Sequence, residues 1–320
     1  MATFIITGGA GFIGSHAVHH FYTSGHKVIV VDKLTYAADK NRIHPEVLLI
    51  EKDIVDLDWA ATIDEHNPKA VINFAAESHV DKSLVAGAGL QFIQSNVLGV
   101  YQIVQGIQRA KHKADLIHIS TDEVLGDFPL DMETLGFTEL ERLRPNNLYA
   151  ATKASAECII QAMQHTHRDF NYVICRATNN FGPNQDLEKF IPTVISSILQ
   201  GKNVPIYAQG ENIREWLWVG DFIRGIDAAV NMPNHVRIDW FNTIFHFGSG
   251  IRISNLALAR MIIRLMGRGQ IEFVADRPGH DQQYALYCNR AKNILKWKLE
   301  QKLEEGLKIV IEDIKKRLVP

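Results

Sequence analysis

Short runs of apolar residues alternate with longer amphipathic segments through the first half of the chain. The apolar runs fall at residues 3–7, 28–31, 47–50, 70–74, 116–120 and 172–177, with a further run at 245–247. Segments with helical periodicity fall at 13–22, 90–111 and 148–167. Strands that alternate with helices are joined by crossover connections, which give a parallel sheet covered by helices on both faces. We therefore expect an α/β fold with a doubly wound parallel sheet and ligands at the carboxyl ends of its strands.

The pattern loosens after Thr178, where helices are expected at 190–200, 221–231, 254–266 and 303–318. We expect these helices to belong to a smaller α/β lobe that binds the substrate and is discontinuous in sequence. The predicted sheet domain covers residues 1–178 together with about 244–249, and the predicted lobe covers 179–243 and 250–320. No linker or low-complexity tract separates them, so we expect one intimate unit with a cleft between its two parts.

Composition and charge argue against several classes of function. The chain has 320 residues, 46% of them hydrophobic and 22% charged, with a formal net charge of −2. Such a charge gives no electrostatic basis for binding nucleic acid or an anionic membrane, and no apolar run approaches the roughly 20 residues that span a bilayer. Because the chain opens on a core strand, we expect no signal peptide and a cytoplasmic location. The scattered Cys158, Cys175 and Cys288 are expected to be buried thiols in a reducing compartment.

The first apolar run leads directly into a glycine-rich turn at residues 8–14. In this pattern Gly8 forms a tight turn, Gly11 lets the backbone approach a pyrophosphate, and Gly14 lets the next helix pack on the strand. The N–H groups and dipole at the start of that helix favour an anion. Asp32 ends the second strand, where a carboxylate accepts hydrogen bonds from an adenosine ribose and repels a 2′-phosphate. This combination predicts a Rossmann-type dinucleotide site that prefers NAD.

Tyr149 and Lys153 are four residues apart, on one face of a predicted helix. The Lys153 ammonium and a positive nicotinamide would favour a tyrosinate and lower the pKa of the Tyr149 phenol. Tyr149 would then remove a hydroxyl proton while a hydride leaves the same carbon. Such a pair is often only a surface pair, but Ser120 and Thr121 at the end of the preceding strand favour the catalytic interpretation.

Two adjacent acids, Asp122 and Glu123, follow the predicted strand 116–120. A helix cap or a solvated loop is one explanation for such a pair. The other is a catalytic pair whose different environments keep one carboxyl group protonated and the other ionised. Thr121 would hydrogen-bond the same substrate oxygen as Tyr149.

With these motifs the chain resembles the extended short-chain dehydrogenase/reductases, and most closely the nucleotide-sugar 4,6-dehydratases of the dTDP-glucose type. The matching segments run nearly from end to end, at residues 7–14, 32–37, 75–81, 120–126, 149–153, 179–183, 189–192, 205–207, 214–217 and 276–281. The acid pair Asp122 and Glu123 distinguishes the 4,6-dehydratases from other members of the family. Related epimerases and decarboxylases resemble this chain in the glycine turn and in the spacing of Tyr149 and Lys153, but they usually lack the acid pair.

The resemblance implies a lyase of deoxysugar biosynthesis with an internal redox cycle. Tyr149, helped by Thr121 and Lys153, would remove the C4 hydroxyl proton of the glucose while NAD takes the C4 hydride. Glu123 would remove the C5 proton as a base, and protonated Asp122 would donate to the departing C6 hydroxyl. The hydride would return to C6, giving a 4-keto-6-deoxyglucose and regenerating a tightly bound NAD. Elimination needs one neutral and one ionised carboxyl group at once, which suits an acid pair.

The resemblance also implies the residues that surround the two ligands. Besides Tyr149 and Lys153, the cofactor site would contain Gly8, Gly11, Phe12, Ile13, Gly14, Asp32, Lys33, Leu34, Thr35, Asp53, Ile54, Phe74, Ala75, Ala76, Glu77, Ser78, Ser95 and Asn180. The nucleotide-sugar site would contain Ser78, Thr121, Asn179, Lys189, Phe190, Pro205, Ile206, Tyr207, Arg214, Asn255, Asp276, Arg277, Pro278, Gly279 and His280.

Three residues of the second set have two interpretations each. Arg214 and Arg277 suit a pyrophosphate, which a guanidinium binds through two parallel hydrogen bonds. Either arginine could instead form a surface salt bridge. His280 is equally well explained as a structural hydrogen-bonding residue. The remaining histidines form no pattern typical of zinc ligands, so we expect no metal site.

Two features depart from the family pattern. Leu125 stands where the family usually has tyrosine, which removes a hydroxyl group near the acid pair. The loop at 127–147 is shorter than in many bacterial relatives. Either departure could alter the sugar pocket, but neither removes a proposed catalytic group.

Several alternatives stay open. A UDP-sugar 4-epimerase or a UDP-glucuronate decarboxylase is the alternative enzyme, and Asp122-Glu123 argues against the epimerase. A catalytically idle NAD(H)-binding sensor would be free to lose reacting groups that are all present here. The sequence does not separate dTDP-glucose from UDP-glucose, whose nucleotides differ by a methyl and a hydroxyl group. By resemblance we expect a homodimer through helices 90–111 and 148–167, although their apolar residues could equally form an intramolecular core.

Overall fold

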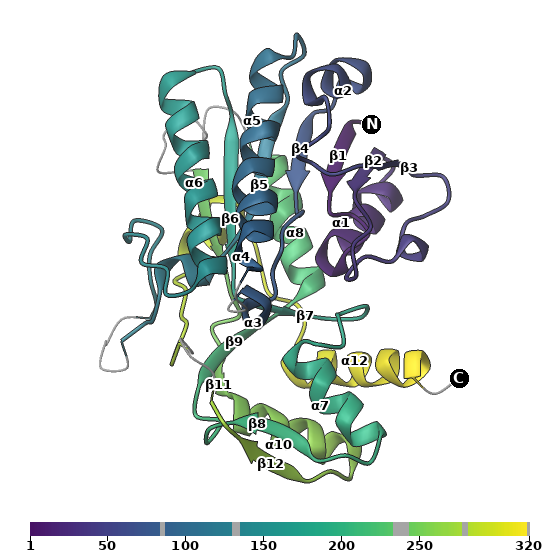
Figure 1. Cartoon of the computed structure of the whole chain (residues 1–320), viewed down its shortest axis with the longest axis vertical. Helices are drawn as coiled ribbons and strands as arrows, with labels where there is room; N and C mark the ends of the chain where they lie inside the picture. The colour runs from purple at the N-terminus through teal and green to yellow at the C-terminus, as the bar shows by residue number, and fades with distance from the viewer. Residues whose placement is uncertain (84–86, 130–134, 233–242, 277–280, 319–320) are drawn as a thin grey trace.

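The computed structural model of the chain describes residues 1–83, 87–129, 135–232, 243–276 and 281–318. Figure 1 shows a larger domain around a sheet and a smaller lobe below it. The seven described strands of this sheet are all parallel, in the order β10-β6-β5-β4-β1-β2-β3. They are β1 (Thr3–Thr7), β2 (Lys27–Asp32), β3 (Leu48–Glu51), β4 (Ala70–Asn73), β5 (Asp115–Thr121), β6 (Tyr172–Ala177) and β10 (Ile244–Phe247). The predicted Rossmann-type sheet is confirmed.

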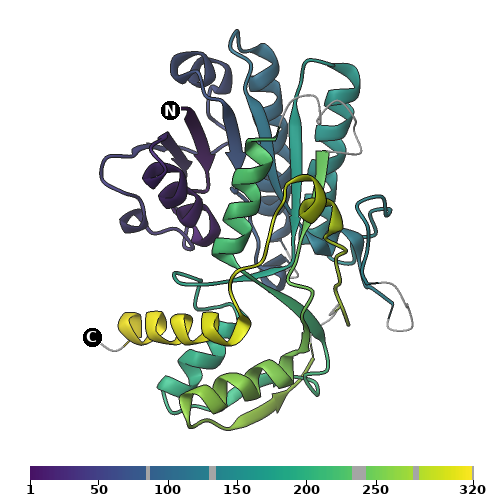
Figure 2. The ribbon, with the colours of Figure 1, turned by 180° about the vertical axis from the view of Figure 1, so that it is seen from behind.

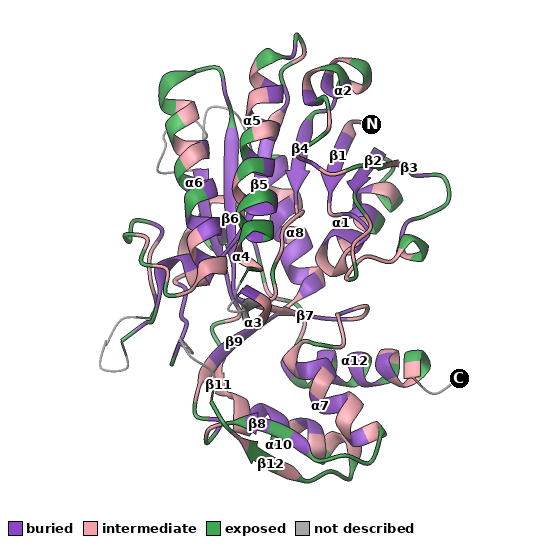
Figure 3. Ribbon diagram, in the orientation of Figure 1, coloured by how far each residue is buried: buried purple, intermediate pink, exposed green. Residues whose placement is uncertain are grey.

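Helices cover both faces of this sheet. They are α1 (Phe12–Thr23) and α8 (Val219–Val230) on one face, and α2 (Trp59–His66), α5 (Gly99–Arg109) and α6 (Leu148–Thr166) on the other. Successive strand residues point to opposite faces, so Phe4 and Ile6 join the first apolar cluster and Ile5 joins the second. Figures 1 and 2 show α5 and α6 on one side of the sheet and α8 on the other. Both clusters are buried, as Figure 3 shows for the strands.

Shorter helical pieces complete the sheet domain. The single helix expected at 90–111 is divided into α4 (Gly89–Phe92), a π-helical turn (Ile93–Leu98) and α5. The other short elements are a 3₁₀ turn at Lys40–Arg42, α3 (Val80–Ser83), a 3₁₀ turn at Asp122–Leu125 and α11 (Asn289–Ile294). The 3₁₀ turn at Asp122–Leu125 follows β5 directly and carries the acid pair.

The smaller lobe has its own sheets and its own apolar core. A three-stranded sheet has the order β11-β9-β7, and a two-stranded sheet pairs β12 with β8. These strands are β7 (Asn179–Phe181), β8 (Val204–Tyr207), β9 (Ile213–Trp218), β11 (Arg252–Ser254) and β12 (Ile271–Val274). The helices α7 (Phe190–Leu199), α10 (Asn255–Met266) and α12 (Leu303–Leu318) pack against them around Ile195, Leu258 and Leu307.

One helix lies elsewhere than expected. The segment at 221–231, expected in the lobe, is α8, which begins at Val219 and contacts α1, β5 and β6. Its buried residues Phe222, Ile223 and Ile226 are continuous with the apolar core of the sheet domain. The burial of this apolar face against the sheet decides where the helix lies, even though neighbouring segments of the chain belong to the lobe. The chain therefore enters the lobe at β7, returns to the sheet at α8 and β10, and enters the lobe again at β11. It returns to the sheet once more at α11, within the range 250–320 expected to be lobe, before α12 ends in the lobe.

Two expectations about the surface have different outcomes. Cys175 and Cys288 are buried free thiols as expected, but Cys158 is exposed on α6, so that expectation is wrong for one thiol of three. Within the described residues, no helix is both long and apolar enough to cross a membrane.

Candidate active site

A cavity of about 360 Å³ opens where the carboxyl ends of the sheet strands meet the smaller lobe. Both predicted residue sets contribute to it, and so does the acid pair. From the predicted sets its walls include Gly8, Gly11, Phe12, Ile13, Gly14, Asp32, Lys33, Thr35, Asp53, Ile54, Phe74, Ala75, Ala76, Glu77, Ser78, Ser95, Thr121, Asp122, Glu123, Tyr149, Lys153, Asn179, Asn180, Lys189 and Phe190. The fold thus brings together residues from the two halves of the chain at the edge predicted for ligand binding.

Other predicted residues lie outside this cavity. The Leu34 N–H donates to Asp32 Oδ1, and the Leu34 side chain packs against the apolar core. Ile206 is fully buried in the core of the lobe, so its side chain is not available to a ligand. Five further predicted residues, Pro205, Tyr207, Arg214, Asn255 and Asp276, do not line the cavity either. The predicted positions Arg277, Pro278, Gly279 and His280 lie outside the described residues.

Arg214 has partners other than the expected phosphate. Its two terminal nitrogens donate to the carbonyl oxygens of Ile213, Gln282 and Asp281 at 2.8, 3.3 and 2.9 Å. The guanidinium also lies 4.5 Å from the centre of the Tyr284 ring. Arg214 is 5% exposed, and in this arrangement it fastens β9 to the segment after residue 280.

The glycine turn leaves no room for side chains. Gly8 has a φ of +65°, and a Cβ there would lie 2.7 Å from the backbone nitrogen of Ala75. A Cβ at Gly14 would lie 2.2 Å from the carbonyl oxygen of Gly8. At the end of β2, Asp32 Oδ2 accepts a 2.9 Å hydrogen bond from the Ala10 N–H, which orients the carboxylate. The bare start of α1 beside an oriented carboxylate fits a dinucleotide.

Polar atoms without partners indicate that the cavity takes a polar ligand. Within the described residues, Thr178 Oγ1, Asn179 Oδ1, Asn180 Oδ1 and Gln185 Oε1 are buried without a hydrogen-bond partner. All four residues line the cavity. Because buried polar atoms are normally paired, these oxygens have the character of ligand contacts. Thr178 and Gln185 are in neither predicted residue set, because both fall outside the segments that match the family.

Thr121 connects the phenol of Tyr149 to the acid pair. β5 ends at Thr121, and α6 begins one residue before Tyr149. The Tyr149 side chain is hydrogen-bonded to Thr121. The Thr121 hydroxyl donates to Asp122 Oδ1 over 3.1 Å and accepts the N–H of Glu123 over 3.3 Å. One hydroxyl group therefore places a phenol and two carboxyl groups at the same end of the cavity.

The two acids occupy different environments. Asp122 is 4% exposed, and no described donor reaches its Oδ2. Burial, with the neighbouring Glu123, raises the pKa of Asp122 well above its usual range. Glu123 is half-buried, and its Oε2 accepts a 3.0 Å hydrogen bond from Asn147 Nδ2. Neither acid caps the 3₁₀ turn, whose N-cap is Thr121, so the helix-cap explanation does not apply.

Tyr149 differs from the expectation of a lowered pKa. Burial and the carboxyl groups of Glu123 and Asp122 raise its pKa above the ordinary value. The Lys153 amine instead donates to the carbonyl oxygen of Ile119 and lies 3.5 Å from His118 Nε2. In this arrangement Lys153 does not lower the pKa of the phenol, because helical spacing does not fix which way a long side chain turns.

Comparisons with known proteins identify the family to which the chain belongs. Residues 4–242 match the family described as the NAD dependent epimerase/dehydratase family. The chain belongs to this family. The predicted NAD cofactor is thereby confirmed. The prediction that the protein is an enzyme is confirmed as well.

Individual relatives support the narrower resemblance. The low-salt glycan biosynthesis protein Agl12 of Haloferax volcanii is 36% identical, over 96% of this chain and 97% of its own length. The dTDP-glucose 4,6-dehydratase 1 of Escherichia coli is 33% identical, over 96% of this chain and 91% of its own. The structure of a Bacillus anthracis dTDP-glucose 4,6-dehydratase in complex with NAD has a TM-score of 0.87 and 31% identity, and covers 99% of this chain and 97% of its own. The predicted resemblance to the 4,6-dehydratases is confirmed.

The Lys153 amine gives this family member a pH-dependent stability. Burial lowers the pKa of Lys153 from 10.5 to about 8. Between these values the unfolded chain keeps a proton that the folded protein has released, so stability rises with pH. We expect the free energy of unfolding of the wild type, relative to Lys153→Met, to increase as pH rises through about 8. Urea titrations from neutral to alkaline pH measure it, and a constant difference would contradict a buried amine.

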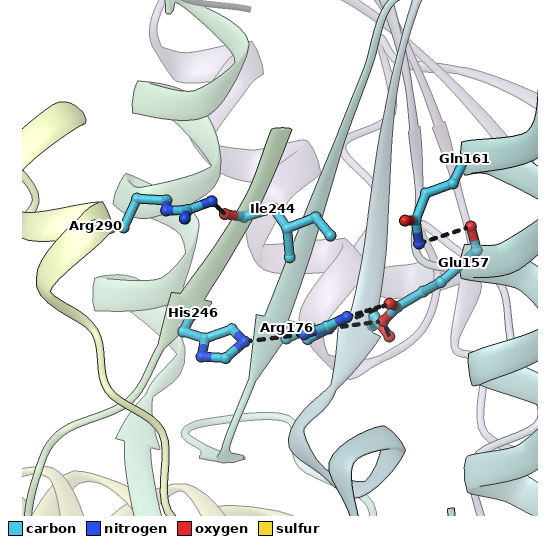
Figure 4. A network of polar contacts seen from close by, with 7 residues as sticks. Glu157, Gln161, Arg176, Ile244, His246 and Arg290 are labelled. Carbon is cyan, nitrogen blue, oxygen red and sulfur yellow. Dashed lines mark hydrogen bonds and ion pairs between the residues drawn. The ribbon is translucent and has the colours of Figure 1, made fainter. Parts of the chain in front are cut away.

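A buried ion pair holds α6 against the sheet, as Figure 4 shows. Arg176 Nη2 of β6 lies 2.7 Å from Glu157 Oε2 of α6, and both side chains are buried. Arg176 Nη1 lies 3.2 Å from His246 Nε2 of β10, and the Ser120 hydroxyl of β5 donates to Glu157 Oε1 over 2.5 Å. The pair therefore connects the helix that carries Tyr149 to three strands, which no sequence motif indicated.

Arg176→Met is expected to destabilise the protein by about 3–5 kcal/mol, because it leaves the Glu157 carboxylate buried without its partner. Equilibrium unfolding in urea measures this loss. The control is the double variant Glu157→Leu/Arg176→Met, which removes both charges and should recover most of the stability. An equal loss in both variants would mean that lost packing, and not an unpaired charge, causes the destabilisation.

Proposed function

We propose that this protein catalyses the NAD-dependent dehydration of a nucleotide-linked glucose, dTDP-glucose or UDP-glucose, to the 4-keto-6-deoxyglucose. The observation that carries the proposal is the acid pair at the end of β5, where Asp122 and Glu123 lie in different environments beside Tyr149. The similarity to dTDP-glucose 4,6-dehydratases supports it. The product would serve deoxysugar biosynthesis of the rhamnose type.

The cavity would hold the cofactor along the glycine turn. Gly8 and Gly14 leave the backbone N–H groups of α1 open to a pyrophosphate, and Asp32 would accept hydrogen bonds from a ribose. When bound, NAD supplies an acceptor for the hydride from C4 and, once reduced, a donor of that hydride to C6. Since the cycle leaves it unchanged, we expect it to be held tightly between turnovers.

Tyr149 would take the proton of the C4 hydroxyl group. Its raised pKa means that the phenolate needs positive charge nearby before it can act as a base. Lys153 lies one helical turn along α6 and would supply that charge by turning from the Ile119 carbonyl oxygen. The Thr121 hydroxyl, already bonded to Tyr149, would orient the same substrate oxygen.

The acid pair would then eliminate water across C5 and C6. A ketone at C4 acidifies the C5 proton, and Glu123 takes it as the base. The electron pair of the C5–H bond forms the C5–C6 double bond while the C6–O bond breaks. Asp122 donates its proton to the leaving hydroxyl group, which departs as water, and its raised pKa keeps that proton available. Glu123 returns a proton to C5 when the hydride reaches C6.

The chemistry of the pair weighs against the alternatives within the family. A 4-epimerase returns the hydride to C4 and has no step that uses two carboxyl groups. A UDP-glucuronate decarboxylase would place a C6 carboxylate against Asp122 and Glu123, where like charges repel. Dehydration is the reaction that gives both acids a role.

The assay incubates the purified protein with dTDP-glucose or UDP-glucose and follows the 4-keto product by its absorbance in alkali. We expect product from at least one of the two nucleotide sugars without added reductant. No turnover of either sugar would refute the dehydratase.

We further propose that the protein is a cytoplasmic homodimer. Leu90, Ile93, Leu98 and Tyr101 are exposed along α4, the π-helical turn and α5, next to α6. Association of two such surfaces would bury these apolar side chains. Light scattering should give twice the chain mass of 36.1 kDa, and a monomer at micromolar concentration would contradict the dimer.

A further inference from the structure

Asn147 joins the start of α6 to the acid pair. It is the N-cap of α6, where its Oδ1 accepts the N–H of Ala150 over 2.8 Å. The other half of the same amide, Nδ2, donates to Glu123 Oε2 over 3.0 Å. One planar group therefore contacts both the helix that carries Tyr149 and the 3₁₀ turn that carries Glu123. No motif in the sequence singled out this residue.

This contact makes the two acids unequal. Asp122 accepts from the Thr121 hydroxyl at Oδ1, while its Oδ2 has no described donor. Glu123 accepts from an amide N–H. A donor to a carboxylate favours the ionised form, and burial of a carboxyl group with one oxygen lacking a donor, as in Asp122, favours the protonated form. The asymmetry runs in the direction that an acid and a base side by side require.

Acidic groups near Glu123 oppose its ionisation, which makes the hydrogen bond from Asn147 more important. Among the titratable groups that face Glu123 are Asp122 on the same turn, Tyr149 on α6 and Tyr284 after residue 280. All three are acids, so their ionised forms oppose a negative charge on Glu123. On β9, Arg214 and Glu215 face Asp122 with opposite charges.

Leu125, two residues after Glu123, provides no polar contact to the acid pair. Leu125 is 1% exposed and packs in the apolar core of the sheet domain. The polar contact to the Glu123 carboxylate from α6 comes instead through the cap of that helix.

We propose that Asn147 is a positioning residue that keeps Glu123 ionised and directed into the cavity for removal of the C5 proton. Its role in catalysis rests on the proposed function, but its effect on Glu123 does not. Asn147 acts through Glu123, and it does not line the cavity.

Two substitutions separate this role from helix capping. Serine and aspartate are both good N-caps, so Asn147→Ser and Asn147→Asp preserve the cap of α6. Serine is too short to keep the contact with Glu123, and aspartate puts a second carboxylate against it. Thermal melting checks the cap, and we expect both variants to melt close to the wild type. Asn147→Ala, which loses cap and contact together, should melt lower.

The decisive readout is the titration of the Glu123 carboxyl carbon by NMR in protein with ¹³C-labelled glutamate, its signal assigned by its absence in Glu123→Gln. Since the carboxylate loses a hydrogen bond that favours its charged form, we expect the midpoint to rise by about one to two pH units in Asn147→Ser. The rise should be larger in Asn147→Asp. The acidic limb of the pH profile for deuterium exchange at C5 should move by the same amount.

The outcomes distinguish this inference from the proposed function. Midpoints in Asn147→Ser and Asn147→Asp equal to that of the wild type would overturn it and leave Asn147 as a helix cap only. The wild type could form no 4-keto product while both variants still shift the Glu123 midpoint. That result would support the effect of Asn147 on Glu123 and refute the dehydratase function. A shifted midpoint with an unchanged exchange profile would overturn the catalytic part of the inference.

Discussion

Glu123→Gln is expected to lower formation of the 4-keto-6-deoxy product by about 10²–10⁴-fold, the range that a general base contributes. Glutamine has nearly the same shape as glutamate but cannot take the C5 proton. The earlier oxidation at C4 does not use Glu123, so the variant should still bind NAD and still oxidise the sugar. We therefore expect the absorbance of reduced nicotinamide to accumulate after mixing with substrate, while solvent deuterium no longer enters C5.

The matched control for this variant is Glu141→Gln. Glu141 is exposed in the loop before α6 and does not line the cavity, so this change should leave turnover and exchange as in the wild type. Deuterium exchange at C5 that is unchanged in Glu123→Gln would exclude Glu123 as the base.

Tyr149→Phe is expected to reduce turnover by a similar factor of about 10²–10⁴, but it should stop the reaction one step earlier. Without the hydroxyl group there is no acceptor for the C4 hydroxyl proton, so the 4-ketone does not form. This variant should therefore show neither reduced nicotinamide nor exchange at C5. Rapid mixing with the nucleotide sugar, followed by absorbance, separates it from Glu123→Gln.

Tyr22→Phe is a suitable control for loss of a tyrosine hydroxyl. Tyr22 lies near the end of α1, hydrogen-bonded to Glu46 and outside the cavity. Its loss should leave each step of the reaction unchanged. If Tyr149→Phe accumulates reduced nicotinamide as fast as the wild type, Tyr149 does not act on the C4 hydroxyl group.

The features predictable from the sequence are those set by local pattern. The apolar runs and the glycine turn at residues 8–14 predict the sheet, its first crossover and the ligand edge, because each depends on neighbouring residues. The acid pair and the Tyr149–Lys153 spacing were likewise visible, and the fold brings all four residues to one cavity.

The features that could not be predicted depend on contacts between distant segments. Arg214 binds backbone carbonyl groups of a segment nearly seventy residues later in the chain. The raised pKa of Tyr149 arises from its burial and from the carboxyl groups of Glu123 and Asp122, and both depend on the packing of α6 on β5. Asn147 is a further example. It was predicted to be part of a loop, but it is both the N-cap of α6 and a donor to Glu123.

The path of one hydrogen atom tests the central claim most directly. dTDP-glucose and UDP-glucose carrying deuterium at C4 would be incubated with the enzyme, and the products examined by NMR. A 4,6-dehydratase moves the deuterium from C4 to the new C6 methyl group, and this is the predicted result. Deuterium that returns to C4 in an epimerised sugar, or no conversion of either substrate, would contradict the account.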